Sequence, residues 1–138
     1  MAKLVYTAPL HFELMFNPIT AGDGKWIAKP PFDGMIIGSR NGPSIDGCIQ
    51  HAGTGGGATT IQVRNTTTGR DYFETKPEFR VADADAGNRS YLRPGTLKIE
   101  PSFKAGDLLA LDVDAVPGGA DSAYATVDLD CEFYREVD

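Results

Sequence analysis

Five carboxylates near the end of the chain are the residues whose types and spacing could do chemistry. They alternate with apolar residues along two predicted strands: Asp112, Asp114, Asp128, Asp130 and Glu132. Oxygen-rich clusters bind Ca²⁺, and paired carboxylates act as acid and base in glycoside hydrolases. A solvated strand face has the same residue types. If the two strands paired side by side, like charges would be staggered and not opposed, which favours the solvated face.

The other residues with catalytic or metal-binding potential are scattered. His11 and His51 are far apart and belong to no H-x-H or H-E-x-x-H pattern. No G-x-S-x-G motif exposes a serine nucleophile, and the glycine segment 53–57 lacks the Lys-Ser/Thr pair of a phosphate-binding loop. The sequence therefore predicts no catalytic residue, no metal and no cofactor, and we expect the protein not to be an enzyme.

Two further groups of residues have a structural interpretation and not a functional one. Asp83, Asp85 and Asn88 are spaced as calcium ligands could be, but no glutamate follows where an EF-hand loop needs its bidentate ligand. Cys48 and Cys131 are interpreted as buried free thiols, since a disulfide would require them to face each other across a sandwich.

Alternating apolar residues predict the strands that would position these side chains. The closing strand has an apolar row of Ala125, Val127, Leu129, Cys131 and Phe133, and the preceding strand has one of Leu109, Leu111 and Val113. The Pro- and Gly-containing segment 116–122 separates them. We expect a hairpin in which Leu109 lies opposite Leu129, because all the apolar residues then share one face.

Length and composition favour one all-β domain. The chain has 138 residues, and its 16 glycines and nine prolines punctuate short apolar runs. No segment has the periodicity of an amphipathic helix. We expect an antiparallel β-sandwich or jelly roll of about eight strands over residues 1–138. Residues 1–30 would be an N-terminal arm or edge strand, with Pro9 at a break or an edge, and residues 76–95 a long loop.

The charge argues against a nucleic-acid partner. The net charge is −6 and the isoelectric point is near 4.8, whereas phosphate binding requires clustered Lys and Arg. No apolar run approaches a membrane span, and no segment resembles a signal peptide. We therefore expect a protein that stays in the cytoplasm where it is made or joins an assembly there.

The best candidates for contact with a partner chain are in the expected long loop. Arg80, Arg89, Arg93 and Tyr91 are of the types enriched in interface anchors. Trp26 is either a core residue or an interface residue.

Several strand-and-turn motifs resemble the small jelly-roll virion proteins of tailed bacteriophages. The motifs are residues 61–65 with Thr68-Gly69, the turn in 103–108, residues 111–119, and the closing strand to Phe133. A strand ending in Asn, a Gly-Asp turn and a strand ending in Asp-Val-Asp are features of this group. The resemblance covers about the last 80 residues well and the first 55 loosely.

The resemblance implies a structural role. Similar proteins are capsid decoration (cement) proteins, head fibres or tail-tip modules, commonly trimeric. It implies a homotrimer that binds the major capsid protein on the outer head surface, as part of a virion assembled in the host cytoplasm. The alternative is a fibre or tail-tip adhesin, a carbohydrate-binding module whose groove would use exposed aromatics among Trp26, Tyr72, Tyr91 and Tyr124.

Overall fold

The chain folds into an all-β structure. The computed structural model describes residues 2–16, 20–38, 44–99, 101–117 and 123–137. The elements are β1 (Ala2–Phe16), β2 (Gly22–Ala28), β3 (Asp33–Ile36), β4 (Ile45–Ile49), β5 (Ala58–Asn65), β6 (Arg70–Asp71), β7 (Phe73–Thr75), β8 (Glu78–Arg80), the 3₁₀ turn η1 (Val81–Asp83), β9 (Ser90–Tyr91), β10 (Thr96–Leu97), β11 (Ser102–Phe103), β12 (Leu109–Ala115) and β13 (Ala123–Val137). Within these residues no helix is long and apolar enough to span a membrane.

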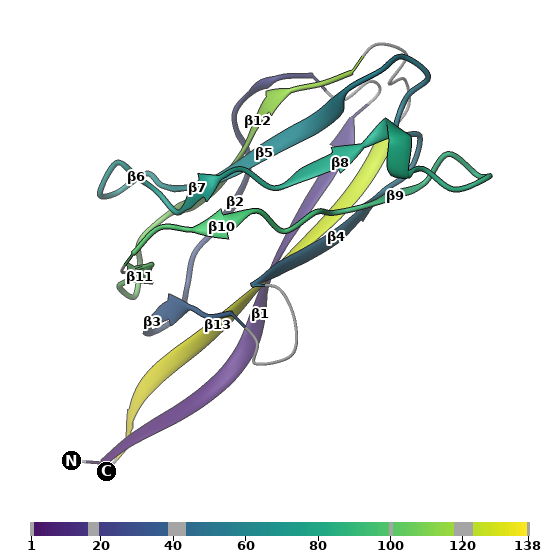
Figure 1. Cartoon of the computed structure of the whole chain (residues 1–138). Helices are drawn as coiled ribbons and strands as arrows, with labels where there is room; N and C mark the ends of the chain where they lie inside the picture. Colours follow the sequence, from purple (N-terminus) through teal and green to yellow (C-terminus); the bar gives the residue numbers. More distant parts are fainter. Residues whose placement is uncertain (1, 17–19, 39–43, 100, 118–122, 138) are drawn as a thin grey trace.

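Two sheets pack face to face as a jelly roll (Figure 1). One sheet has the order β1-β13-β4-β9, with β3 also on β13 and β11 on β3; the other has the order β2-β12-β5-β6, with β8 also on β5. If interrupted strands are joined (β3 with β4, β6 to β8, and β9 with β10) and the two-residue β11 is set aside, eight strands remain. Apart from β5 and the joined β6 to β8, which pair with each other, consecutive strands lie in opposite sheets, as in the two Greek keys of a jelly roll. The predicted antiparallel β-sandwich is thus confirmed.

The predicted hairpin of the last two long strands is wrong. β12 pairs with β2 and β5, whereas β13 pairs with β1, β3 and β4 in the opposite sheet. The two apolar rows still point into one core, with Leu111 and Leu129 fully buried. Alternation identifies the inward row of each strand, but it does not decide whether two rows lie side by side or face each other. In the expected turn 116–122, residues 118–122 lie outside the described residues.

The expected long loop 76–95 is largely ordered and closes one side of the sandwich. It contains β8, η1 and β9, and Glu78 forms a β-bridge with Arg93. β9 pairs with β4 of one sheet, and β10 pairs with β7, which lies beside the other. These strands have two or three residues each, too few to show the alternation that predicts a strand.

The opposite side of the sandwich is open. Among the described residues β1 pairs only with β13 and β2 only with β12, so both are edge strands. β1 and β13 form a long ribbon that carries both termini away from the body (Figure 1). Pro9 lies opposite Asp130, whose backbone bonds to Ser44 and Ile37 on the other side of β13. The Pro9 backbone therefore points to the free edge, where a missing N–H removes no ladder bond.

A buried polar network explains why the motif residues are Asn and Asp. The Asn65 Nδ2 donates to the Tyr72 hydroxyl at 3.0 Å and to Asp107 Oδ2 at 2.9 Å, and Lys104 N also donates to Asp107 Oδ2. Burial raises the pKa of Tyr72, whose hydroxyl donates to the carbonyl of Ser102 at 2.8 Å. These bonds tie the turn after β5 to the turn before β12. The motifs thus hold two core turns together.

Candidate interaction surfaces

The five carboxylates do not form one cluster. Asp112 and Asp114 are on β12, and the other three are on β13 in the opposite sheet. The expectation that all five lie on a solvated face is wrong for Asp112, which is only 3% exposed. Its carboxylate accepts from Gly24 N at 2.7 Å and from Arg64 Nε at 2.9 Å. On the same outer face of β12, Ala110 is also fully buried, whereas Asp114, near the end of the strand, is exposed.

Two of the remaining four carboxylates form ion pairs, and Glu132 accepts a hydrogen bond from the Tyr134 hydroxyl at 2.9 Å. Asp114 contacts Lys76 Nζ at 2.8 Å. Asp128 contacts His11 Nδ1 at 2.8 Å, and Glu13 contacts the other ring nitrogen of His11 at 3.0 Å. These two carboxylates raise the pKa of His11. Among the described residues, no three His, Cys, Asp or Glu side chains are arranged to hold a metal ion.

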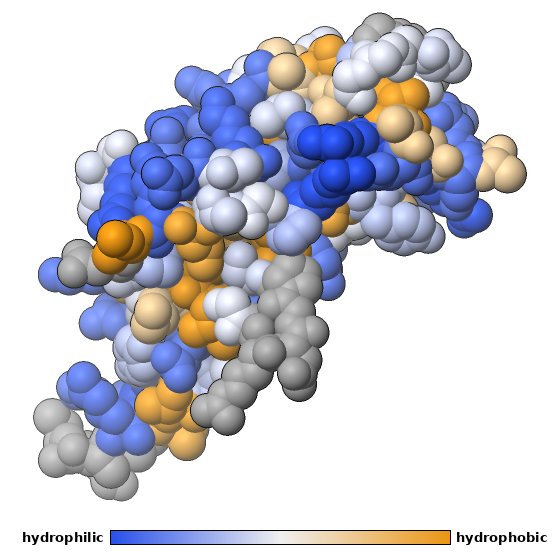
Figure 2. All heavy atoms as spheres, in the orientation of Figure 1, coloured by the Kyte–Doolittle hydropathy of each residue, from blue (hydrophilic) through white to orange (hydrophobic). Residues whose placement is uncertain are grey.

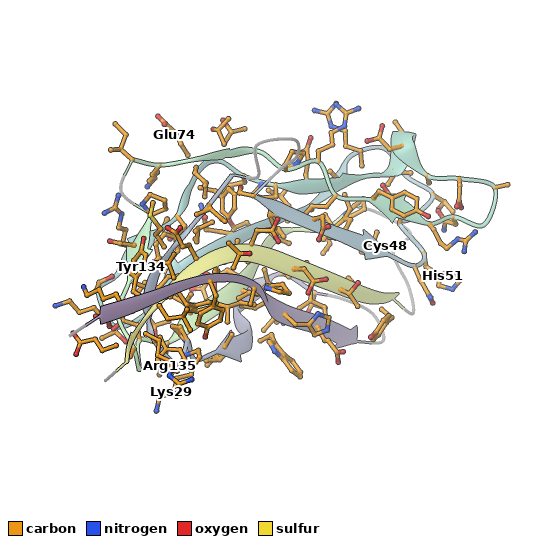
Figure 3. All side chains as sticks on the ribbon, turned by 90° about the horizontal axis from the view of Figure 1, so that it is seen from below. Lys29, Cys48, His51, Glu74, Tyr134 and Arg135 are labelled. Atoms are coloured by element: carbon orange, nitrogen blue, oxygen red, sulfur yellow. The ribbon has the colours of Figure 1, made fainter. Side chains whose placement is uncertain are left out.

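The two cysteines are free thiols. Cys131 is fully buried in the core row, and burial raises the pKa of its thiol to about 12. A thiol with so high a pKa is a poor nucleophile at neutral pH. Cys48 is half-buried on β4, and Figure 3 shows it with His51 toward the end of the molecule away from Tyr134 and Arg135.

The arginines proposed as partner contacts each have an acidic neighbour in their own segment. Arg93 makes two bonds to Asp83, at 2.7 and 3.0 Å. Arg89 contacts Asp85 at 3.2 Å, and Arg80 contacts Glu78. Asp83 and Asp85 thus serve as ion-pair and turn acceptors, and these pairs fix the guanidinium groups on the surface.

The two aromatic contact candidates lie on different sheets. Tyr91 is 61% exposed on β9, the edge of the closed side, and Trp26 is 40% exposed on β2, the edge of the open side. The structure therefore does not bring Trp26 together with the arginine segment. Of the aromatics suggested for a sugar groove, Tyr72 is fully buried and is excluded, and Tyr124 is 37% exposed on β13.

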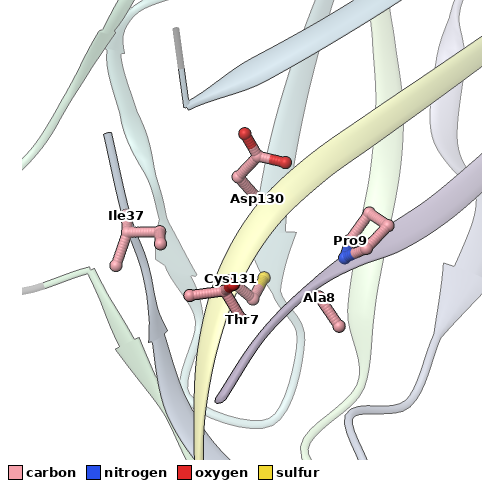
Figure 4. A pocket seen from close by; sticks show the side chains of 6 residues that line it. All are labelled: Thr7, Ala8, Pro9, Ile37, Asp130 and Cys131. Atoms are coloured by element: carbon pink, nitrogen blue, oxygen red, sulfur yellow. The ribbon is translucent and has the colours of Figure 1, made fainter. Parts of the chain in front are cut away.

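A hollow of about 340 Å³ lies where β13 changes neighbours from β3 to β4 (Figure 4). Its lining is Thr7, Ala8, Pro9, Ile37, Asp130 and Cys131. Desolvation raises the pKa of Asp130, and the negative charges of Asp46 and Asp128 raise it further. Asp130 and the protonated thiol of Cys131 do not form the pair of nucleophile and general base that covalent catalysis requires.

A second hollow, of about 530 Å³, lies beside the two motif turns. Phe103 and Tyr134 supply aromatic lining, and Asp33, Lys104 and Asp107 supply charged groups. A third, of about 670 Å³, lies between the glycine segment and Pro117, with the Glu78–Arg80 pair in its lining.

Exposed aliphatic residues are the surface feature that the sequence did not single out. Ile27 on β2, Leu4 and Val5 on β1, and Ile99 are about half exposed or more. Figure 2 shows hydrophobic atoms in a band along the middle of one face and in a further group close to the termini. The exposure of the residues on β1 and β2 depends on the position of these strands at the sheet edges, which follows from the topology.

Comparisons with known proteins give a distant structural likeness. No family model matches the chain, and no curated protein matches it. It is similar to a chain of the cyanophage Pam1 capsid asymmetric unit, with 15% sequence identity over 97% of this chain and 85% of that chain, at a TM-score of 0.38. At this TM-score the likeness is too distant to assign a shared fold or a function.

Proposed function

We propose that this protein is a bacteriophage structural protein, a non-enzymatic capsid decoration (cement) protein. In this role it binds the major capsid protein on the outer surface of the head as a homotrimer and stabilises the shell. It is made in the host cytoplasm and becomes part of the virion.

The observation that carries the proposal is the agreement between motif and fold. The strand-and-turn motifs resemble those of jelly-roll virion proteins, and the chain that contains them is a jelly roll. Asn65 and Asp107, the motif residues that follow β5 and precede β12, bond to each other in the core. These two residues support the jelly-roll fold and not the decoration role directly, because one fold serves many functions.

The surface also fits a protein that binds other proteins. Ion-paired arginines and Tyr91 are presented along the closed side, and apolar residues are exposed on the open side. Arginine and aromatic residues are common interface anchors. An acidic surface with a net charge of −6 keeps the free protein soluble before assembly.

The test is a head-binding experiment. Heads are purified from the parent phage after deletion of the gene, and the purified protein is added. We expect it to co-sediment with the heads, to raise the temperature at which they release DNA, and to occupy symmetry-related positions on the outer surface in electron micrographs. Failure to bind expanded heads would overturn the proposal.

The hollow beside the motif turns favours one second candidate, the carbohydrate-binding adhesin. Its lining combines the half-buried ring of Tyr134 and the exposed carboxylate of Asp33 with the buried Phe103 and Asp107 at its base. Aromatic faces and carboxylate acceptors are suited to sugar rings and hydroxyls. Titration with a panel of monosaccharides, read on the amide NMR signals of Thr67, Thr68 and Lys104, distinguishes this candidate; shifts at these residues together with labelling on the tail would favour it.

A further inference from the structure

The edge strand β2 is interrupted by a bulge. Trp26 lies opposite Leu111, and the next paired residue, Gly22, lies opposite Val113. Three residues of β2 thus lie between positions that only Asp112 separates on β12. The strand has two residues more than regular antiparallel pairing needs at this place. Extra residues of this kind break the ladder locally and bend the strand that contains them.

The side chain of Asp112 holds the bulge in its shape. Asp112 alternates with the inward residues Leu111 and Val113, so it lies on the outer face of β12. Its Oδ1 accepts from Gly24 N at 2.7 Å, and Arg64 Nε on β5 donates to its Oδ2 at 2.9 Å. Gly24 has a φ of +63°, a conformation that residues with a Cβ rarely adopt. The acceptor and the glycine therefore both suit this one backbone shape.

The bulge leaves β2 only a short regular edge. Leu108 accepts from Thr66 N at 2.8 Å, so the backbone of Ala110, two residues further on, also points to β5. Ile27 lies opposite Ala110, and its N–H and C=O therefore point to the free edge. Within the regular stretch 26–28, Ile27 is the only residue with this orientation. A strand from another chain would find one residue to bond before it met the bulge.

Charged side chains protect the same edge. Lys25 and Lys29 stand two residues before and two residues after Ile27. Lysines on an edge strand oppose the addition of a further strand, and β-bulges and prolines have the same effect. On the other edge of the open side, the backbone of Pro9 in β1 points outward without an N–H. The two edges are thus protected by different means.

We propose that the bulge formed by residues 23–25, held by the Asp112 carboxylate, prevents the free edge of β2 from adding a strand of a second copy of this chain. Such protection is needed here because Trp26 and Ile27 are 40% and 53% exposed, and an exposed apolar edge strand promotes aggregation. The bulge blocks ladder formation and leaves these side chains at the surface. The inference goes beyond the proposed function and does not depend on it, since it concerns one edge in any oligomeric state.

Deleting Asp23 and Gly24 tests whether the bulge blocks pairing. The deletion removes the two extra residues, so Lys25 would lie opposite Asp112 and the other residues of β2 would keep their faces. By light scattering, wild type should keep one mass from micromolar to millimolar concentration. The deletion variant should form larger assemblies over this range. A folded deletion variant with the mass of wild type would overturn the proposal.

Two further variants show which feature is responsible. Ile27→Pro, added to the deletion, removes the outward N–H without removing a bond to β12. It should return the assemblies to the mass of wild type; assemblies that persist would not form through this edge and would contradict the proposal. Lys25→Thr with Lys29→Thr in the full chain removes the charges and keeps the bulge. This variant should keep the wild-type mass, and its assembly would assign the protection to the lysines and not to the bulge.

Hydrogen exchange tests the proposal on the native protein and does not require the deletion variant to fold. The Trp26 N–H points to β12 and should be protected, whereas the Ile27 N–H should exchange freely. Protection of Ile27 in the native oligomer would reveal a strand added at this edge, and the proposal would then be wrong. Neither result bears on head binding, so a failure of this inference leaves the proposed function intact.

Exchange at Gly24 tests the role of Asp112. In Asp112→Ala the Gly24 N–H has lost its acceptor, and its exchange should become about tenfold faster or more, because hydrogen bonds to charged groups are the stronger ones. Asp128→Ala, the same change on β13, is the matched control and should leave this rate unchanged. An unchanged rate at Gly24 in Asp112→Ala would overturn the assignment of Asp112 as the residue that holds the bulge.

Discussion

β12 and β13 have the same alternation of apolar and acidic residues, but their acidic residues have different surroundings. Asp112 on β12 is buried and ion-paired with Arg64, whereas Asp128 on β13 is half-exposed and paired with His11. Both strands are central in their sheets, β12 between β2 and β5 and β13 between β1 and the pair β3 and β4, but only β12 has a fully buried residue, Ala110, on its outer face among the described residues. Alternation thus identifies an inward row, and the exposure of the other row depends on what the fold places over it.

The largest expected effect tests what the two strands have in common. Leu111→Ala and Leu129→Ala each remove a fully buried side chain from the same core, one from each sheet. Each should lower the free energy of unfolding by about 2–5 kcal/mol, the usual loss when a buried leucine leaves a cavity. Denaturant melts measure both. A loss below about 1 kcal/mol for either one would contradict the shared core.

The next effect tests how the two strands differ. Asp112→Ala leaves the Arg64 guanidinium and the Gly24 N–H without their acceptor and should cost about 1.5–3 kcal/mol. Asp128→Ala removes a half-exposed pair and should cost about 0.5 kcal/mol or less. The same melts provide the comparison. Equal losses would mean that the two outer faces are equally covered.

The fold could be predicted to the level of layers but not of pairing. The inward rows of the last two strands are correct because period-two alternation is a direct consequence of strand geometry, and Val127, Leu129 and Cys131 are buried as expected. Their partners were wrong because a sandwich buries two rows face to face as well as a hairpin buries them side by side. Short strands such as β8 and β9 carry no pattern to detect.

The candidate surfaces were predictable only in part. Arg80, Arg89, Arg93 and Tyr91 were identified from residue type, and the structure places all four on or beside the segment that closes the sandwich. Ile27 gave no signal, since an exposed isoleucine in a short strand looks like a core residue. Its exposure follows from the edge position of β2, which depends on pairing between residues far apart in the chain.

A smaller effect concerns the charge of Asp130. Desolvation and the nearby carboxylates of Asp46 and Asp128 raise its folded-state pKa, so the ionised form is disfavoured in the native state. The native state then binds more protons than the unfolded state between the two pKa values, and stability falls as pH rises through the folded pKa. Asp130→Asn should raise the melting temperature slightly at neutral pH and leave it unchanged in acid, where the wild-type group is protonated. A lower melting temperature at pH 7 would contradict the shift.

The smallest effect compares the two ion pairs with each other. The carboxylates of Asp128 and Glu13 raise the pKa of His11, which can lose its charge as the pH rises, whereas the Arg64 guanidinium stays charged throughout. The pKa of His11 is raised above its ordinary value of 6.5, so the pair stabilises fully below that value and is lost as pH rises through the folded pKa. Wild type should therefore lose a small increment of melting temperature across this window, and His11→Gln should not.

Because the His11 ring is about half exposed, this increment of melting temperature should also shrink in high salt. Melting curves from pH 5.5 to 8.5 at low and high salt give the answer. An increment unchanged in His11→Gln would mean that another group titrates in the window, and that the His11–Asp128 pair adds nothing to the β1–β13 ribbon.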